Sequence, residues 1–261
     1  MITTGELYSY FDRKIPRALS CDWDNDGLMV CADSTREVKK ALFALDVTDA
    51  VADYAIAGGY DLIISHHPLI FSPLKAINTE NPVCARALRL IAAGISVFSF
   101  HTRLDALDGG VNDILAASLG LENTRPFGPA GEEMGRIGEL AREMTAESFT
   151  ALVKERVSSH ITGHFTEREI RTVAVLGGSG RDFIDAAKAA GAEVFLCGEA
   201  GYHAVLDAPS LGIGVVEAGH YETENGVSAF FADAFRSDYP EIVFEIYPRE
   251  GEFVHWKGDA K

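Results

Sequence analysis

Two successive histidines, His66 and His67, follow the apolar run of residues 62–64 and precede Pro68. Ligand sites in parallel α/β sheets lie beyond the carboxyl ends of the strands. Adjacent residues on an extended chain point in opposite directions, so this pair suits two metal ions better than one, and Pro68 keeps His67 extended. An isolated His-His-Pro is also compatible with surface or capping histidines, so the motif needs support from elsewhere in the chain.

Two further polar groups follow apolar runs. His101 and Asp105 come directly after one run, and His220 and Glu224 come after another. Because His220 and Glu224 are four residues apart, one helical turn or a tight loop aims both inward. Alone, Asp105 is compatible with a turn carboxylate and Glu224 with a helix-start carboxylate. Three such groups at the ends of three predicted strands indicate one shared site.

These residues supply three imidazoles and two carboxylates, with His101 beside them. Two dications about 3.5–4 Å apart need several ligands each and usually a bridging carboxylate or hydroxide. We therefore predict two divalent metal ions per chain, with Glu224 as the bridge and open positions for water or substrate. This set of nitrogen and oxygen ligands is compatible with Zn, Fe, Mn, Co or Ni and selects none of them. His101 is a candidate for proton transfer or for a sixth ligand. The predicted metal ligands are His66, His67, Asp105, His220 and Glu224.

The elements that must position these residues alternate between short β-branched runs and helical periods. This alternation is typical of sheets with crossover helices. We expect strands at residues 41–47, 60–65, 95–100, 171–176, 193–197, 213–217 and 241–247. We expect helices at residues 49–57, 82–93, 110–119, 146–157, 181–190, 199–206 and 223–235.

The predicted fold class is α/β, with two Rossmann-like α/β lobes, parallel or mixed sheets, and the metal site in the cleft between the lobes. Gly and Pro are frequent from Arg125 to Gly138, which predicts a lobe boundary there. The first lobe is expected to span residues 1–125 and to be completed by about residues 226–261. The second lobe is expected to span residues 126–225.

Composition and charge disfavour several classes of protein. The 261 residues carry a net charge of −16, from 39 acidic and 23 basic residues. Nucleic-acid-binding proteins normally present a basic face, so nucleic acid is disfavoured as a partner. No run approaches the roughly 18 apolar residues of a membrane helix, and the first residues lack the features of a secretory signal. The four cysteines form no C-x-x-C pair. We expect a soluble, cytoplasmic protein without membrane association.

Weaker features have competing interpretations. Residues 177–180, Gly-Gly-Ser-Gly, lie between a predicted strand and helix and could cradle a phosphate. They lack the full G-x-G-x-x-G pattern, so a tight turn is favoured. His160 and His164 are four residues apart, but the intervening Gly163 argues against one helical face. His203 is a candidate for lining the pocket, and His255 is expected to face solvent.

The sequence resembles the Nif-three-like family of dinuclear-metal-centre proteins, whose members are named GTP cyclohydrolase I type 2 homologues. The resemblance covers nearly the whole chain. It differs from the family pattern at Cys197 and Glu199, where Thr and Asp are usual. The matching segments are Trp23-Asp-Asn-Asp-Gly-Leu28, Leu45-Asp-Val-Thr48, Ser65-His-His-Pro68, His101-Thr-Arg-Leu-Asp105, Gly198-Glu-Ala-Gly-Tyr-His203 and Gly219-His-Tyr-Glu-Thr-Glu224.

The leading functional hypothesis is a metal-dependent hydrolase acting on a nucleotide-like or heterocyclic small molecule. GTP as the substrate is implied by the resemblance alone. The alternative is a non-catalytic metallochaperone or a module that binds a metal or a metal-bearing cofactor. The resemblance also implies a homo-hexameric toroid with its sites facing the interior, and a short form with no inserted middle domain.

Overall fold

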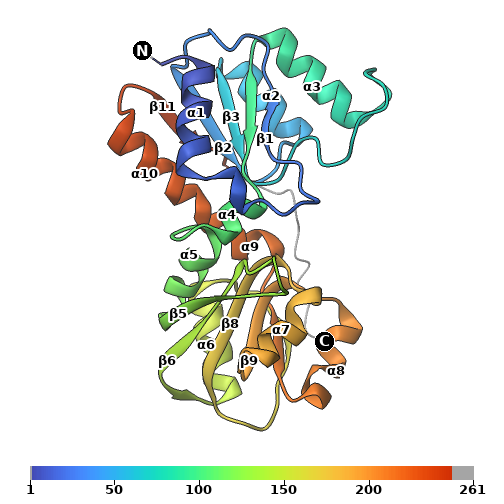
Figure 1. Cartoon of the computed structure of the whole chain (residues 1–261), viewed down its shortest axis with the longest axis vertical. Coiled ribbons are helices and arrows are strands. Elements are labelled where there is room, and N and C mark those ends of the chain that lie inside the picture. The colour runs from blue at the N-terminus through green and yellow to red at the C-terminus, as the bar shows by residue number, and fades with distance from the viewer. Residues whose placement is uncertain (1, 249–261) are drawn as a thin grey trace, which may run out of the picture.

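The computed structural model describes residues 2–248, in which two sheets build two lobes stacked along the longest axis of the molecule (Figure 1). The first sheet has the strand order β1-β4-β3-β2-β11, in which β1 runs antiparallel to β4 and the other neighbours are parallel. Its strands are β1 (Gly27–Val30), β2 (Lys40–Ala44), β3 (Leu62–Ser65), β4 (Ser96–Ser99) and β11 (Val243–Ile246).

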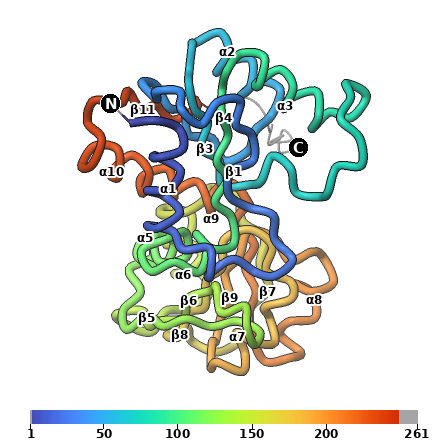
Figure 2. Tube along the Cα trace, turned by 45° about the horizontal axis from the view of Figure 1, so that its top comes forward, coloured from blue at the N-terminus to red at the C-terminus, as the bar shows by residue number. Residues whose placement is uncertain are grey.

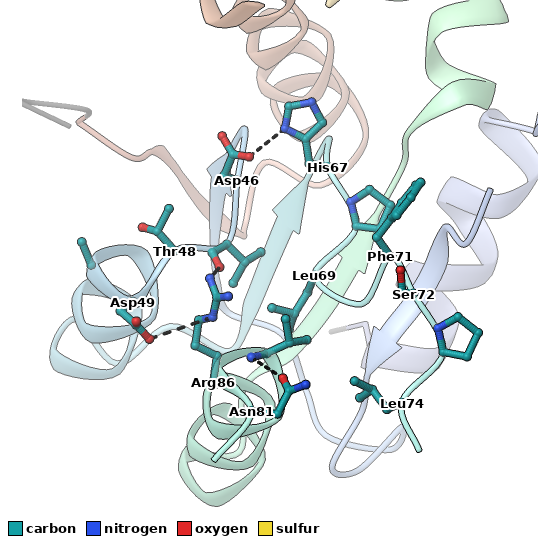
Figure 3. Close-up of a pocket in the computed structure, with 15 residues that line it drawn as sticks. Asp46, Thr48, Asp49, His67, Leu69, Phe71, Ser72, Leu74, Asn81 and Arg86 are labelled. Atoms are coloured by element: carbon teal, nitrogen blue, oxygen red, sulfur yellow. Dashed lines mark hydrogen bonds and ion pairs between the residues drawn. The ribbon is translucent and has the colours of Figure 1, made fainter. Parts of the chain in front are cut away.

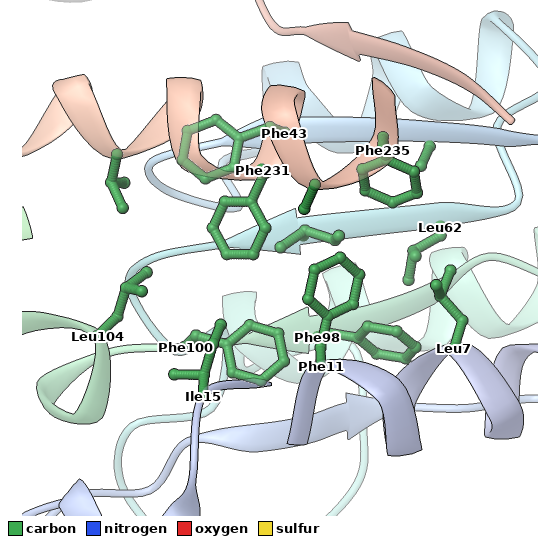
Figure 4. Close-up of a cluster of buried hydrophobic side chains, with 14 of the residues drawn as sticks. Leu7, Phe11, Ile15, Phe43, Leu62, Phe98, Phe100, Leu104, Phe231 and Phe235 are labelled. Atoms are coloured by element: carbon green, nitrogen blue, oxygen red, sulfur yellow. The ribbon is translucent and has the colours of Figure 1, made fainter. Parts of the chain in front are cut away.

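Helices cover both faces of this first sheet. Successive strand residues point to opposite faces, so Phe43 of β2 packs in one apolar cluster and its neighbour Leu42 in another. Figure 4 shows the cluster on the Phe43 side, where Phe11 and Phe231 meet the sheet from two helices. The helices of this lobe are α1 (Thr4–Lys14) and α10 (Ser228–Asp238) on the Phe43 side, and α2 (Asp49–Ala57) and α3 (Pro82–Ala93) on the other.

The second sheet is mixed. Its strand order is β5-β6-β8-β9-β10-β7, with β8, β9 and β10 parallel to one another and the remaining neighbours antiparallel. Its strands are β5 (Glu122–Phe127), β6 (Gly135–Met144), β7 (Thr162–His164), β8 (Ile170–Ser179), β9 (Val194–Glu199) and β10 (Gly214–Glu217). Its helices are α5 (Val111–Ser118), α6 (Ala146–Arg156), α7 (Ile184–Ala189) and α8 (Tyr202–Leu211). These two sheets with covering helices confirm the predicted α/β class.

Two short helices lie where the lobes meet. They are α4 (Thr102–Ala106), which follows β4 of the first sheet, and α9 (His220–Glu224), which follows β10 of the second. Figures 1 and 2 both place α9 at the junction, and α9 contacts α5, β8 and β9. The segments that leave the carboxyl ends of parallel strands in both sheets therefore meet at this junction.

Several local predictions differ from the structure. The stretch from residue 125 to 138, where Gly and Pro predicted a boundary, contains the end of β5, a turn and the start of β6. Gly128, Pro129 and Gly131 lie in that hairpin turn, so turn residues mark a connection within one sheet here. Because β5 begins at Glu122, this strand lies on both sides of residue 125. The division into lobes at residues 125 and 225 stays a prediction.

The predicted helix over residues 223–235 is in fact three pieces. They are α9, a 3-10 turn (Asn225–Val227) and α10. A Cβ at Gly226 would lie 2.9 Å from the Ile114 side chain, so the chain passes α5 closely at this break. The predicted helix after residue 180 likewise begins as a 3-10 turn (Arg181–Phe183) before α7.

No helix within residues 2–248 combines the length and the apolar character that crossing a membrane requires. The predicted exposure of His255 concerns a residue outside the described part of the chain.

Candidate metal centre

Strands β3 and β4 deliver the first group of side chains. They pair in parallel register with Ser65 opposite Ser99, so the residues that follow them emerge at the same edge. The two serine hydroxyls lie 2.8 Å apart, and the Phe100 amide donates to the Ser65 carbonyl at 2.9 Å. These bonds fix the strand ends from which His66 and His101 depart. The end of β3 thus carries His66 and His67, and the end of β4 carries His101 with Asp105 on α4.

Helix α9 delivers the second group from the other lobe. Gly219, with φ +92°, turns the chain sharply before α9 begins at His220. His220 and Glu224 occupy the two ends of this five-residue helix, with Nε2 of His220 3.2 Å from Oε2 of Glu224. One helical turn therefore directs both side chains to one place, as their spacing predicted.

Glu224 lies at the centre of the cluster. Its Oε1 lies 3.8 Å from Nε2 of His66, while its Oε2 lies 3.0 Å from Nε2 of His67. Asp105 Oδ1 lies 3.5 Å from the same nitrogen of His66. Among residues 2–248, two sets of side chains have possible ligand atoms within 4.8 Å of one another. They are His66 with His67 and His101, and His67 with His220 and Glu224.

Burial divides the cluster into two halves that share Glu224. The inner half is His66 and Asp105, whose side chains are 0% and 11% exposed. The outer half is His67 and His220, whose side chains are 22% and 38% exposed. The structure thus brings together His66, His67, His101, Asp105, His220 and Glu224, although their roles as ligands stay a prediction.

Each of the four histidines uses Nδ1 to bind an acceptor outside the cluster. This arrangement is typical of metal-ligating histidines, whose other ring nitrogen then faces the ion. Of these acceptors, only the Phe100 carbonyl belongs to the backbone. The pairs are His66 with the Phe100 carbonyl (2.9 Å), His67 with Asp46 (2.8 Å), His101 with Asp24 (2.9 Å) and His220 with Glu199 (3.2 Å).

Two buried polar atoms of the inner half have no hydrogen-bond partner among the described residues. They are Nε2 of His66 and Oδ1 of Asp105. An unsatisfied buried polar group costs about 1–3 kcal/mol, and more when it is charged. A cation bonded to these atoms would remove that cost, and imidazole with carboxylate is an ordinary ligand set for transition metals. The clustered side chains therefore fit a metal ion.

The titration behaviour of the two halves differs. Burial lowers the pKa of His66, and burial together with the nearby charge of Glu224 raises the pKa of Asp105. Burial also acts to lower the pKa of His67, but contacts with Asp46 and Glu224 outweigh it and raise this pKa to about 10. The contact with Glu224 raises the pKa of His220. Burial would raise the pKa of Glu224, yet its histidine neighbours hold it well below its usual value.

The glycine-rich segment does not form a phosphate cradle. The amides of Gly177, Gly178 and Gly180 already donate to Asn112, Thr223 and the Glu199 carbonyl. A Cβ on Gly178, whose φ is +68°, would lie 2.2 Å from Oε1 of Glu224. The absence of a side chain here makes room for the Glu224 carboxylate, a role that the sequence pattern alone did not suggest.

The remaining predicted histidines lie apart from the cluster. His203 is exposed on α8, and His164 of β7 binds the Leu206 carbonyl through Nδ1. Neither these two nor His160 belongs to the described groups that could hold a metal.

Sequence reasoning missed the carboxylates that lie outside the cluster and orient its histidines. Asp24 and Asp46 belong to two of the segments on which the family resemblance rests, but no chemistry was assigned to them. Each pairs with a histidine that lies at least 21 positions away along the chain, so spacing did not reveal its orienting role. The side chain of Asp24 is fully buried, and it also accepts from the amide and hydroxyl of Thr102.

The fold and the cluster together define a class of two-lobed α/β proteins with a histidine–carboxylate centre at the lobe junction. The chain belongs to the Duf34/NIF3 (NGG1p interacting factor 3) family, whose sequence profile matches residues 2–250. This finding confirms the resemblance noted from the motifs.

Individual relatives agree with this assignment. A GTP cyclohydrolase 1 type 2 homolog of Clostridium acetobutylicum is 34% identical over 228 residues, which cover 84% of each chain. The Protein NIF3 homolog of Schizosaccharomyces pombe is 34% identical over 224 residues, which cover 80% of each chain. The crystal structure of a Bacillus cereus protein related to NIF3 matches with a TM-score of 0.84 at 26% identity, over 98% of this chain and 100% of that one. Reduced HcgD from Methanocaldococcus jannaschii matches with a TM-score of 0.82 at 28% identity, over 94% of this chain and 97% of that one.

Proposed function

We propose that the protein is a hydrolase that holds two divalent metal ions and acts on a small nucleotide-like or heterocyclic molecule. The observation that carries this proposal is the position of Glu224. One of its carboxylate oxygens faces His66 of the inner half, and the other faces His67 and His220 of the outer half. A carboxylate that presents one oxygen to each of two ligand sets is the usual bridge in two-metal sites.

Divalent ions held by these residues would supply Lewis-acid polarisation and the activation of water near neutral pH. The chain itself supplies proton transfer through His101. Burial would raise the pKa of Asp24, but its bond to His101 dominates and lowers this pKa to about 2. Asp24 therefore stays ionised and holds the Nδ1–H of His101, so that Nε2 is the nitrogen able to exchange a proton with substrate or water. Coordination by the same Nε2 is the alternative role of His101.

GTP is the first substrate to test, because curated relatives carry the name GTP cyclohydrolase 1 type 2 homolog. Protein loaded with Zn, Fe, Mn, Co or Ni should turn over GTP or another member of a nucleotide and heterocycle panel, and chelation should abolish this turnover. Wild-type activity should rise with pH and then level off. Absence of ring-opened product from GTP would exclude the cyclohydrolase activity alone.

Two substitutions separate metal binding from proton transfer. Asp105→Asn should lower metal content and hydrolysis together. His101→Ala should leave metal content largely intact while slowing hydrolysis by roughly 10²–10⁴-fold. His203→Ala, at an exposed histidine on α8, is the matched control and should change neither quantity. If His101→Ala loses metal in proportion to activity, His101 is a ligand.

The competing function is carriage of a metal or of a metal-bearing cofactor. It is favoured if fully loaded protein turns over nothing in a metal-dependent way but transfers its metal to an apo-acceptor. His101→Ala should then change the release rate. A homo-hexamer with its sites facing the interior is the assembly we propose from the family resemblance, and light scattering that gives a monomer mass at micromolar concentration would contradict it.

A further inference from the structure

Two large aromatic side chains stand half-exposed beside His101. Trp23 is 52% exposed and Phe71 is 51% exposed. The ring centroids of Trp23, Phe71 and His101 are each 6.3 Å from the other two, and all three pairs meet edge to face. Covering exposed apolar side chains of this size with a ligand removes them from water, which favours binding. Its position next to the candidate proton-transfer residue links it to the metal centre.

The two aromatic residues come from separate loops that are fixed to each other. Trp23 lies between the 3-10 turn (Arg17–Leu19) and β1, and Phe71 lies in the segment after β3. The Asn25 side chain donates to the Ile70 carbonyl, which joins the two loops one or two residues from the rings. The Trp23 indole N–H donates to Glu132 Oε1 of the second lobe at 3.0 Å. These bonds hold both rings beside His101 before any ligand binds.

Phe71 also borders a pocket that reaches the metal centre. The pocket has a volume of about 860 Å³, and His67, Phe71 and Arg86 line it from different elements (Figure 3). This volume suits a nucleoside-sized molecule. Asp46 and Asp49 line the same pocket, so the charge of Arg86 is offset and does not select an anion. Recognition here therefore depends on the ring of the ligand more than on a phosphate.

We propose that Trp23 and Phe71 form an aromatic stacking site for the planar ring of a heterocyclic substrate. That ring would stack on the face of one of the two side chains, meet the other edge to face, and lie beside His101. This inference rests on the proposed function and names the part of the substrate that the protein recognises. Stacking on aromatic side chains is favourable for every nucleobase because each has a π-face. The remainder of the molecule would extend into the pocket that Phe71, Arg86 and His67 line.

Binding of a nucleoside without phosphate tests the proposal apart from turnover. Guanosine and uridine are titrated calorimetrically into zinc-loaded protein, and both should bind. Trp23→Leu and Phe71→Leu should each weaken binding by about fivefold or more, while Trp23→Phe should retain most of the affinity. Metal content should match wild type in all three variants. Tyr202→Leu, at a tyrosine that is 75% exposed on α8, is the matched control and should bind as wild type.

Inorganic pyrophosphate provides the second probe, because it can reach the metal centre but has no ring. Its affinity should be equal in wild type, Trp23→Leu and Phe71→Leu. Failure of both nucleosides to bind the loaded wild type, or equal nucleoside affinity in all variants, would overturn the stacking site. Light scattering of Trp23→Leu that gives a different oligomeric mass from wild type would also overturn it. Such a result would mean that a second copy of the chain, and not a substrate, covers the two rings. Nucleoside binding without any turnover would overturn only the hydrolase.

Discussion

The inner and outer halves of the centre use the same residue type in opposite surroundings. His66 is fully buried, its Nδ1 binds a backbone carbonyl, and burial lowers its pKa. His67 and His220 are partly exposed, their Nδ1 atoms bind carboxylates, and their pKa values are raised. The inner imidazole therefore favours its neutral form, whereas the outer imidazoles keep their protons to higher pH, and a metal that binds them would have to displace those protons. Two factors cause this difference in pKa: the deeper burial of His66, and the negative charge of the carboxylates that bind Nδ1 of His67 and His220.

The two halves also differ in how accessible they are to solvent and substrate. The pocket reaches His67 but does not include His66 or Asp105 among its lining residues. A metal held in the outer half could therefore exchange ligands with solvent or substrate, while one in the inner half is enclosed by protein. We expect the inner position to retain its ion and the outer position to serve substrate.

Glu224→Gln should have the largest effect, because Glu224 is the residue that the two halves share. The substitution removes one anionic oxygen and replaces it with an amide nitrogen, which donates hydrogen bonds and does not ligate cations well. More than half of the metal should be lost from purified protein, measured by elemental mass spectrometry against chain concentration. Glu222→Gln, on the same short helix, should keep the wild-type content. Full occupancy of Glu224→Gln would remove Glu224 from the centre.

Chelation should separate the halves in time. Dialysis of loaded protein against EDTA should release about one ion per chain quickly and about one slowly, since two ions are expected and the outer half is accessible. His220→Ala should abolish the fast phase, and Asp105→Asn should abolish the slow phase. A single phase that both variants affect equally would show that the halves do not differ in access.

The sequence was sufficient to predict the strand ends and the cluster, for a physical reason. β3 begins as a continuous apolar run that stops at polar residues, and β4 lies in a mostly apolar stretch, residues 95–100, that stops at His101. Such runs are the strongest signal of buried parallel strands. His66, His67, His101, Asp105, His220 and Glu224 therefore fall together once the sheets are assembled. The same apolar runs also predicted the α/β fold class, which the structure confirms.

Two of the strands that were not predicted, β5 and β7, lack such a local signal. Four of the six residues of β5 are polar, one is Pro126, and every residue of β7 is exposed, so neither strand has an apolar period. The orienting roles of Asp24 and Glu199 depend on contacts across the fold, which no spacing along the chain reveals. The need for Gly178 arises from the approach of Glu224, 46 positions further along the chain. Such effects appear only in three dimensions.

The smallest expected effect is the number of protons that the protein releases when it binds metal. This number tests the electrostatic difference between the two halves directly. The folded pKa of His67 is about 10, above its ordinary value of 6.5. Its protonated form thus adds stability to the metal-free protein that is fully present below about pH 6.5 and lost as pH rises through about 10. A metal ion needs the neutral imidazole, so binding near pH 7.5 should release about one proton from His67 and a further fraction from His220. His66, whose pKa is lowered, should release none.

Calorimetric titration of zinc into chelator-treated protein, compared in phosphate and Tris buffers of different ionisation enthalpy, gives the number of protons released. His67→Asn should reduce that number by about one, and His66→Asn should leave it unchanged at whichever position still binds. An unchanged count in His67→Asn would show that the outer imidazole is already neutral, which would remove the electrostatic distinction between the two halves while leaving their difference in access.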